Sequence, residues 1–436
     1  MGKRILALLL CTLALLSLAA CSSGAAEPAP SPSAGVTLRV VTSYGRGDGN
    51  RKSYEAAVAS YEAETGNRVI DESSTSDEEW KNEVLTDFMT GSEPDVLFYF
   101  TDVDAEPFIK AGRVVSIEEI REEYPDYATN MKPSMIATAS DGLHYAVPST
   151  GYWENLFVNR RVMEACGLPL PGPDYSWEQF LADCQVIRDA GYTPIACSLF
   201  EIPHYWFEFA VLNNGTLDGH LTVPRLGADG HLVQDAAARS WIAGIEDIRG
   251  LYEAGFFPEN TLTATDAETV ALFAEGKAAF LIDGSWKVGY FAEYYPEHLE
   301  DFVICYVPGK GQRLATEAIG GISMGYFITR KAWEDPEKRD AAVAFVFHMT
   351  SEEVLSSFIT TEVTALIDGA DPEGLNALQQ SAADANAHIT GIVGAVQDGI
   401  SGEAKTELFA DIQKCVTGQM SAEEAVEAAI RLNEEP

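Results

Sequence analysis

Basic residues are scarce in this 436-residue sequence, in which 29 lysines and arginines stand against 67 aspartates and glutamates, a formal net charge of −38 at pH 7. A surface of this sign repels the phosphates of nucleic acids and anionic lipid headgroups. We therefore expect no nucleic-acid partner and no polyanionic ligand. Only a local basic pocket would override this overall field.

The sequence also lacks the common motifs of metal and phosphate chemistry. It has no HExxH, no EF-hand loop and no P-loop, and its seven histidines are scattered. Beyond residue 21 the cysteines match neither a zinc spacing nor a CxxC redox pair: Cys166, Cys184, Cys197, Cys305 and Cys415. We expect buried thiols, with one bridge such as Cys184–Cys197 left open, and we expect no metal and no cofactor.

Long apolar runs are absent except at the start of the chain. Lys3 and Arg4 precede the apolar run Ile5–Leu18, which is typical of a secretory signal and too short for a membrane anchor. The ending Leu18-Ala19-Ala20-Cys21 resembles a bacterial lipobox. This resemblance implies that residues 1–20 are a signal peptide and that Cys21 carries lipid; cleavage without lipid is the alternative.

Residues 21–36 are rich in Pro, Ser and Ala, a composition that cannot form a core and favours an extended tether. Together with the signal, this tether predicts an extracytoplasmic protein that is lipid-anchored to the cell membrane, on the outer face of a Gram-positive type cell.

The body shows an alternation of strand-like and helix-like segments. Residues 36–45, 67–74 and 94–100 predict strands, and residues 53–65 and 77–89 predict amphipathic helices between them. A β-α-β-α-β order implies a parallel sheet covered by helices, with ligands at the carboxyl ends of the strands.

The same pattern continues to the end of the chain, so the predicted class is α/β throughout. Further strands are predicted at 141–149, 154–162, 193–198, 278–283, 302–309 and 322–329, and further helices at 176–191, 201–218, 236–255, 267–276 and 335–350, before a mostly helical tail from residue 351.

Five runs resemble, in order, motif blocks of the extracellular solute-binding proteins of ABC importers, the family-1 or maltose-binding-like group. They lie within residues 61–74, 91–119, 141–184, 273–286 and 335–351, and include PDVLFYF and FAEGKAAFLIDGSW. The chain departs from the pattern at Val158, where the family has tyrosine, and in 359–374, where an expected loop is missing. Any ligand contact from 359–374 is therefore left open.

The resemblance implies a two-lobed periplasmic-binding-protein-like (Venus flytrap) α/β fold whose hinge is crossed three times, with ligand held between the lobes. The expected crossings lie near 145–150, 295–300 and 345–352. The N-terminal lobe would then comprise 37–147 plus 298–348, and the C-terminal lobe 148–297 plus 349–436.

Sugar recognition needs aromatic planes for stacking and polar side chains for the hydroxyls. The chain places such groups at and near strand ends, and we predict ligand contacts from Tyr44, Tyr99, Asp102, Tyr152, Trp153, Glu154, Glu201, Tyr205, Trp206, Asp283 and Trp286. By the resemblance, Trp286 matches a stacking aromatic, and Tyr152 stands where the maltose-binding branch has an acid.

These candidates have structural alternatives. Trp286 could close a core, and Asp102 and Asp283 could fix local turns or helix ends. In the pairs Tyr152–Trp153 and Tyr205–Trp206, one ring must point away from any ligand.

We therefore predict a monomeric, non-enzymatic binding protein that captures a carbohydrate and delivers it to the transmembrane subunits of an ABC permease. Polyols and cations stay open as ligands. Two alternative functions are a glycan-acting hydrolase and a ligand-sensing subunit for a membrane kinase. The hydrolase hypothesis has a G-x-S-x-G match at 321–325, but the run after Ser323 predicts a strand where this motif needs a helix.

Overall fold

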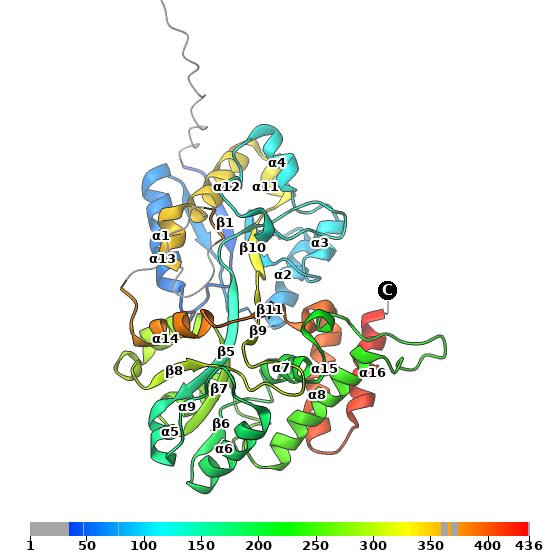
Figure 1. Ribbon diagram of the computed structural model, residues 1–436. Coiled ribbons are helices and arrows are strands. Elements are labelled where there is room, and N and C mark those ends of the chain that lie inside the picture. The colour runs from blue at the N-terminus through cyan, green and yellow to red at the C-terminus, as the bar shows by residue number, and fades with distance from the viewer. Residues whose placement is uncertain (1–34, 47, 77, 359–364, 368–373, 435–436) are drawn as a thin grey trace, which may run out of the picture. The chain divides into compact units, whose positions relative to one another are not determined.

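The computed structural model describes residues 35–46, 48–76, 78–358, 365–367 and 374–434 (Figure 1). The predicted signal peptide, the lipidation site Cys21, most of the tether and most of 359–374 lie outside these residues. Within the described part of the chain, no helix combines the length and the apolarity needed to cross a membrane.

The first sheet has the strand order β2-β1-β3-β10-β4. Its strands are β1 Thr37–Val41, β2 Arg68–Asp71, β3 Val96–Phe100, β4 Val147–Pro148 and β10 Met324–Ile328. As predicted, β1 is parallel to β2 and β3, but β10 is antiparallel to β3 and β4, so the sheet is mixed. The strand predicted at 141–149 is reduced to two residues.

Helices cover both faces of this sheet. Along β3, Val96 and Phe98 point into a core with α1 (Arg51–Thr65) and α12 (Pro336–Met349), whereas Leu97 and Tyr99 point into a core on the opposite face. That second core contains α2 Glu78–Thr90 and α3 Glu106–Lys110. A strand buried on both faces explains the continuous apolar run of residues 96–100.

The second sheet has the order β11-β9-β5-β7-β6, and β8 also pairs with β5. Its strands are β5 Tyr152–Asn159, β6 Thr193–Ile195, β7 Ala278–Gly284, β8 Phe302–Cys305, β9 Glu317–Gly321 and β11 Gly391–Val393. The central strand β5 is antiparallel to β7, β8 and β9. The predicted strand 154–162 ends at Asn159, because the Asn159 side chain accepts the Val162 N–H and begins a helix there.

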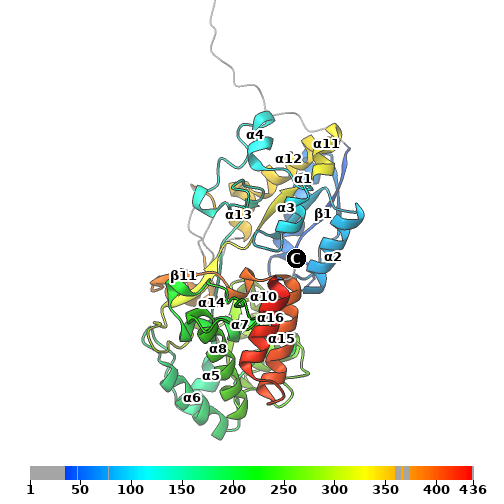
Figure 2. The same ribbon diagram turned by 90° about the vertical axis from the view of Figure 1, so that its right-hand side faces the viewer.

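The helices that pack with this sheet are α5 Arg160–Cys166, α6 Trp177–Asp189, α7 His204–Asn214, α8 Ala236–Glu253, α9 Asp266–Ala274, α10 Trp286–Tyr294, α14 Ala377–Asn386, α15 Gly402–Val416 and α16 Ala422–Glu434. The C-terminal pair α15 and α16 lies against α8 (Figure 1, Figure 2). Smaller helices complete the chain: α4 Ile117–Glu123, α11 Arg330–Glu334, α13 Glu352–Phe358 and the 3-10 turn η4 Val396–Gly399.

Three of the predicted helices have capping residues at one end. Helix α1 ends at Gly66, whose φ of 75° is left-handed. The Ser176 side chain caps α6, and Asp335 caps α12 with Pro336 in the first turn.

The lobe boundaries differ from the predicted ones. Strands β8 and β9 pair with β5, so residues 302–321 belong to the second sheet, and the chain returns to the first sheet between Gly321 and Met324 rather than near 295–300. Helix α13 and Leu366 lie in the core of the first sheet, so the third passage follows residue 366. We call the described residues within 35–149 and 322–366 the N-terminal lobe, and those within 150–321 and 374–434 the C-terminal lobe.

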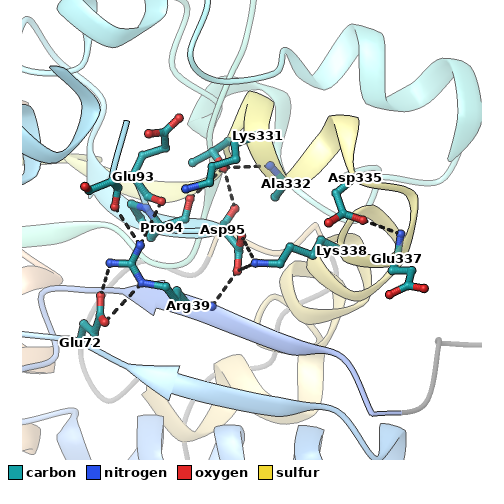
Figure 3. A network of polar contacts seen from close by, with 12 residues as sticks. Arg39, Glu72, Glu93, Pro94, Asp95, Lys331, Ala332, Asp335, Glu337 and Lys338 are labelled. Atoms are coloured by element: carbon teal, nitrogen blue, oxygen red, sulfur yellow. Dashed lines mark hydrogen bonds and ion pairs between the residues drawn. The ribbon is translucent and has the colours of Figure 1, made fainter. Parts of the chain in front are cut away.

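A polar network fixes the start of β3 within the N-terminal lobe (Figure 3). The buried carboxylate of Asp95 accepts bonds from Lys338 Nζ at 2.8 and 2.9 Å and from the Arg39 N–H at 2.8 Å. Arg39 in turn pairs with Glu72 through its guanidinium at 2.7 Å. This network ties β1, β2 and α12 to the start of β3, so its role is structural.

All five described cysteines are free thiols. The bridge Cys184–Cys197, which the sequence left open, is not formed. Both side chains are buried in the core of the C-terminal lobe, as expected of small apolar residues.

Candidate functional site

Three aromatic side chains meet at one edge of the second sheet. The ring centroids of Tyr152 and Trp286 are 6.3 Å apart, and those of Tyr205 and Trp286 are 6.2 Å apart, with interplanar angles of 32° and 36°. All three residues are half-buried. We call them the aromatic cluster.

The pairing of β5 with β7 brings the cluster together. Glu154 lies opposite Gly284, so the start of β5 sits beside the turn from β7 into α10. The Ser285 N–H donates to the Trp153 carbonyl at 2.9 Å and fixes that turn. The indole of Trp286 lies over Gly284, where a Cβ would come within 2.2 Å of the ring, so this position requires glycine.

A pair of buried carboxyl groups lies next to the aromatic cluster. Glu154 follows Tyr152 on the same face of β5, and Glu208 lies one turn after Tyr205 on α7. The two carboxyl groups lie close enough for each to affect the pKa of the other. Gln397 Nε2 donates to Glu208 Oε2 at 3.3 Å.

Burial is the main cause of the shifted acidity of this pair. It raises the pKa of Glu154 to about 8, and the carboxylates of Asp283 and Asp398 add to the shift. Burial and the neighbouring Glu154 raise the pKa of Glu208 well above its usual range. The pair therefore holds a proton at neutral pH.

A lysine balances the next acids. Lys287 Nζ lies 2.9 Å from Asp266 Oδ2 and 3.5 Å from Asp283 Oδ2. Burial still raises the pKa of Asp283 to about 7. Asp283 Oδ1 also accepts the Gly284 N–H at 2.8 Å, so this side chain helps to fix its own turn, as the structural alternative predicted.

The N-terminal lobe contributes a second acidic group. Asp102 Oδ1 accepts the Asp104 N–H at 2.9 Å, which is the local turn that the alternative predicted. Burial and the carboxylate of Asp398 raise the pKa of Asp102 to about 7. Asp398 also acts electrostatically on Tyr152, which connects this acidic group to the aromatic cluster.

His204 lies between the aromatic cluster and two lysines. Its ring centroid is 4.2 Å from that of Tyr205. Burial and the charges of Lys81 and Lys405 lower the pKa of His204 to about 3, so the imidazole is neutral.

The other predicted contacts lie elsewhere. The rings of Tyr44 and Tyr99 are buried in the two cores of the N-terminal lobe, and those of Trp153 and Trp206 are buried in the core of the C-terminal lobe. Glu201 is exposed and accepts the Asp266 N–H at 2.6 Å. The structure thus brings together five of the predicted contacts: Tyr152, Glu154, Tyr205, Asp283 and Trp286. Asp102 is connected to this group because the charge of Asp398 acts on both Asp102 and Tyr152.

Sequence reasoning missed Glu208, Gln397, Asp398 and Lys405. Glu208 had a usable signal, because it is a single acid inside the apolar helix segment YWFEFAVL. The other three come from the tail, whose pattern carries no such signal.

A hollow of ≈ 340 Å³ lies elsewhere, between α1 and the helices α12 and α13. On its wall, His348 Nε2 contacts Ser60 Oγ at 2.8 Å, and Glu64 lies 3.4 Å from Nδ1, a contact pattern like that of a serine hydrolase. However, Nε2 also lies 3.0 Å from the Ala57 carbonyl and must donate to it, so it cannot accept the Ser60 proton. We therefore do not assign the site to this hollow.

Ser323 does not have the setting of a nucleophile elbow. It directly precedes strand β10, and its carbonyl accepts the Thr101 N–H at 2.8 Å. The motif requires a sharp turn into a helix, which is not present here.

Solved structures of solute-binding proteins share this architecture. A chitin oligosaccharide binding protein is 19% identical, with a TM-score of 0.77 and coverage of 92% of this chain and 98% of that chain. The solute-binding protein RafE in complex with raffinose is 18% identical, with a TM-score of 0.73 and coverage of 92% and 100%. The maltodextrin-binding domain MalE from Bdellovibrio bacteriovorus bound to maltotriose is 19% identical, with a TM-score of 0.68 and coverage of 92% and 99%. These likenesses establish a shared two-lobed fold.

Comparison of sequences gives the family. None of the curated protein sequences compared with the chain matches it. The family model described as bacterial extracellular solute-binding protein matches residues 47–355, which is most of the chain. The chain therefore belongs to the family of bacterial extracellular solute-binding proteins.

Proposed function

We propose that this protein captures a carbohydrate at the aromatic cluster and the adjoining acids, and delivers it to an ABC permease. The observation that carries the proposal is the set of half-buried rings of Tyr152, Tyr205 and Trp286 beside the buried carboxyl groups of Glu154 and Glu208. Rings stack on the C–H faces of a pyranose, and the acids accept hydrogen bonds from its hydroxyls. The ligands named for the similar solved structures, chitin oligosaccharide, raffinose and maltotriose, support this ligand class.

Capture would proceed by closure of the two lobes. Contacts such as that of Lys405 with Asp104 join the lobes beside the site. A ligand that contacts both lobes stabilises this closed arrangement by its differential affinity for it. The permease would then recognise the closed form.

The remaining parts of the proposal concern the location of the protein, its oligomeric state and the fate of its ligand. The lipobox-like sequence supports an extracytoplasmic protein tethered through lipid on Cys21. We propose that it works as a monomer, and that the chemistry of its ligand is unchanged by binding.

A ligand screen tests this function. Lipid-free protein starting at residue 22 would be screened by thermal shift and calorimetry against sugars, oligosaccharides, polyols and amino acids. A bound carbohydrate at about 100 times its Kd should stabilise the fold by about 2.7 kcal/mol. Trp286→Ala should reduce this stabilisation to about 1 kcal/mol or less, and the sugar should be recovered intact.

Other outcomes separate the alternatives. Cleavage of the sugar would establish the hydrolase alternative. In cells, loss of labelled-sugar uptake in the Trp286→Ala strain supports delivery, whereas normal uptake with lost binding indicates a sensor. If no carbohydrate binds, the proposal is wrong.

A further inference from the structure

The buried groups beside the aromatic cluster offer acceptors without donors. Among the described residues, Glu154 Oε2, Glu208 Oε1 and Gln397 Oε1 are buried and have no hydrogen-bond partner. The exposed fractions of these three residues are 3%, 0% and 5%. The contact of Gln397 with Glu208 and the mutual contact of the two glutamates place the three oxygens in one locality.

The charged neighbours of this locality are acids. Glu154 faces Glu208 on α7, Asp283 on β7 and Asp398 on η4, and Glu208 faces Glu154 and Asp398. Two lysines contact acids of this surrounding: Lys287 contacts Asp266 and Asp283, and Lys405 contacts Asp104 and Asp398. Among the described residues, no basic side chain forms an ion pair with Glu154 or Glu208 themselves.

We propose that the carbohydrate carries a cationic amino group, which binds at Glu154, Glu208 and Gln397; this inference rests on the proposed function. An ammonium group has three N–H donors and no acceptor, so it matches a locality with three buried acceptor oxygens that lack a partner. Its positive charge offsets the cost of burying the carboxylates. The ring faces of the aromatic cluster attract a cation as well as an apolar sugar face.

In the competing arrangement, the glutamate pair keeps its proton and binds a neutral sugar. The two arrangements predict opposite changes of affinity with pH. An amine ligand displaces the shared proton, so binding releases protons and tightens as pH rises from 6 to 7.5 or so, while the amine stays charged. Binding of a neutral sugar requires that the pair keeps the shared proton. It therefore releases no protons, and its affinity falls as pH rises over the same range.

Matched ligands test the proposal directly. Sugars with an amino group at C2, C3 or C6 would each be compared by calorimetry with the sugar that carries a hydroxyl there, using the whole lipid-free chain. We expect at least one amino sugar to bind about tenfold or more tightly than its neutral partner. Neutral sugars that bind as tightly as, or more tightly than, every amino partner would overturn the inference and leave the proposed function intact. If no sugar of either kind binds, both are wrong.

The proton count gives a second readout that needs no variant. Titrations of the wild-type chain in two buffers of different ionisation enthalpy give the number of protons released per ligand. Release on binding of the amino sugar supports the proposal, and zero release or uptake contradicts it.

Two variants then assign the effect to the pair. Glu208→Gln removes the charge at nearly the same volume and should abolish the advantage of the amino sugar over its neutral partner. Glu253→Gln, which removes an exposed carboxylate paired with Arg249, should change neither. An unchanged preference in Glu208→Gln would contradict the assignment.

Discussion

Lys405 Nζ lies 3.0 Å from Asp104 Oδ2, and this ion pair joins the C-terminal lobe to the N-terminal lobe. The side chains of Lys405 and Asp104 are 1% and 7% exposed. Lys81 Nζ contacts the same carboxylate oxygen at 3.0 Å from within the N-terminal lobe. Because lysines of both lobes contact this oxygen, we infer that the ion pair stabilises the closed arrangement of the lobes. We call the contact of Lys405 with Asp104 the latch.

Removal of the latch should favour opening. Lys405→Met keeps the length of the side chain but removes its charge, and Lys81 still balances Asp104. We expect ligand affinity to fall roughly tenfold, since a broken buried pair costs more than an exposed one. Small-angle scattering of the ligand-free protein should show a larger radius of gyration. Lys414→Met on the same helix, at an exposed site, should show neither change; equal effects of both substitutions would exclude the latch.

Gly49 and Gly289 form a second contact between the lobes, in which the backbones meet. A Cβ at Gly49 would lie 2.6 Å from the Trp286 carbonyl oxygen and 2.9 Å from Gly289 Cα. Gly49→Ala should therefore hinder closure and weaken ligand binding by tenfold or so, because the loop must shift to relieve the contact. The melting temperature of the ligand-free protein should change little.

Gly250 on α8 provides the control, because a Cβ there meets nothing within 4 Å. Gly250→Ala should bind ligand normally and gain about 0.5–1 kcal/mol of stability, as alanine in a helix does. Normal binding by Gly49→Ala would show that closure does not bring these backbones together.

The buried acids predict a pH dependence of stability. Burial raises the pKa of Glu154 to about 8 in the folded chain, above its ordinary value of 4.5. Between these values the folded state binds more protons than the unfolded state, so the free energy of unfolding falls as pH rises. Asp102 and Asp283, with pKa values raised to about 7, act in the same direction.

Urea titrations of the ligand-free protein at pH 5, 6, 7 and 8 would measure this fall. We expect a loss on the order of 3 kcal/mol across the range, and a smaller loss in Glu208→Gln, which removes one member of the pair. A loss in Glu208→Gln as large as that in the wild type would contradict the shared proton.

The sequence predicted the local elements of this fold better than their assembly. The apolar run of β3 and the caps Ser176 and Asp335 specify their elements locally, so both could be read from neighbouring residues. The return of the chain between Gly321 and Met324 depends on β8 and β9 pairing with β5, a long-range choice that no local pattern encodes.

The same limit applies to the site. Trp286 and Tyr152 could be proposed from the turn and strand end that hold them. In contrast, Trp206 and Tyr205 are adjacent in sequence, and only packing decides that Trp206 is 2% exposed while Tyr205 faces the aromatic cluster. Glu208 and Gln397 are far apart in the chain, so their contact could not be predicted.

Two tryptophan substitutions should separate binding from packing. Trp286 is half-buried in the aromatic cluster, so Trp286→Ala should weaken carbohydrate binding by about 2 kcal/mol, close to thirtyfold, with little change in stability. Trp206 is 2% exposed in the core, so Trp206→Ala should cost about 3–5 kcal/mol of unfolding free energy. Calorimetry and urea titration of both variants would measure these effects. If Trp286→Ala lost stability and the folded protein still bound sugar, the indole would be a core residue, and the aromatic cluster would not be the ligand site.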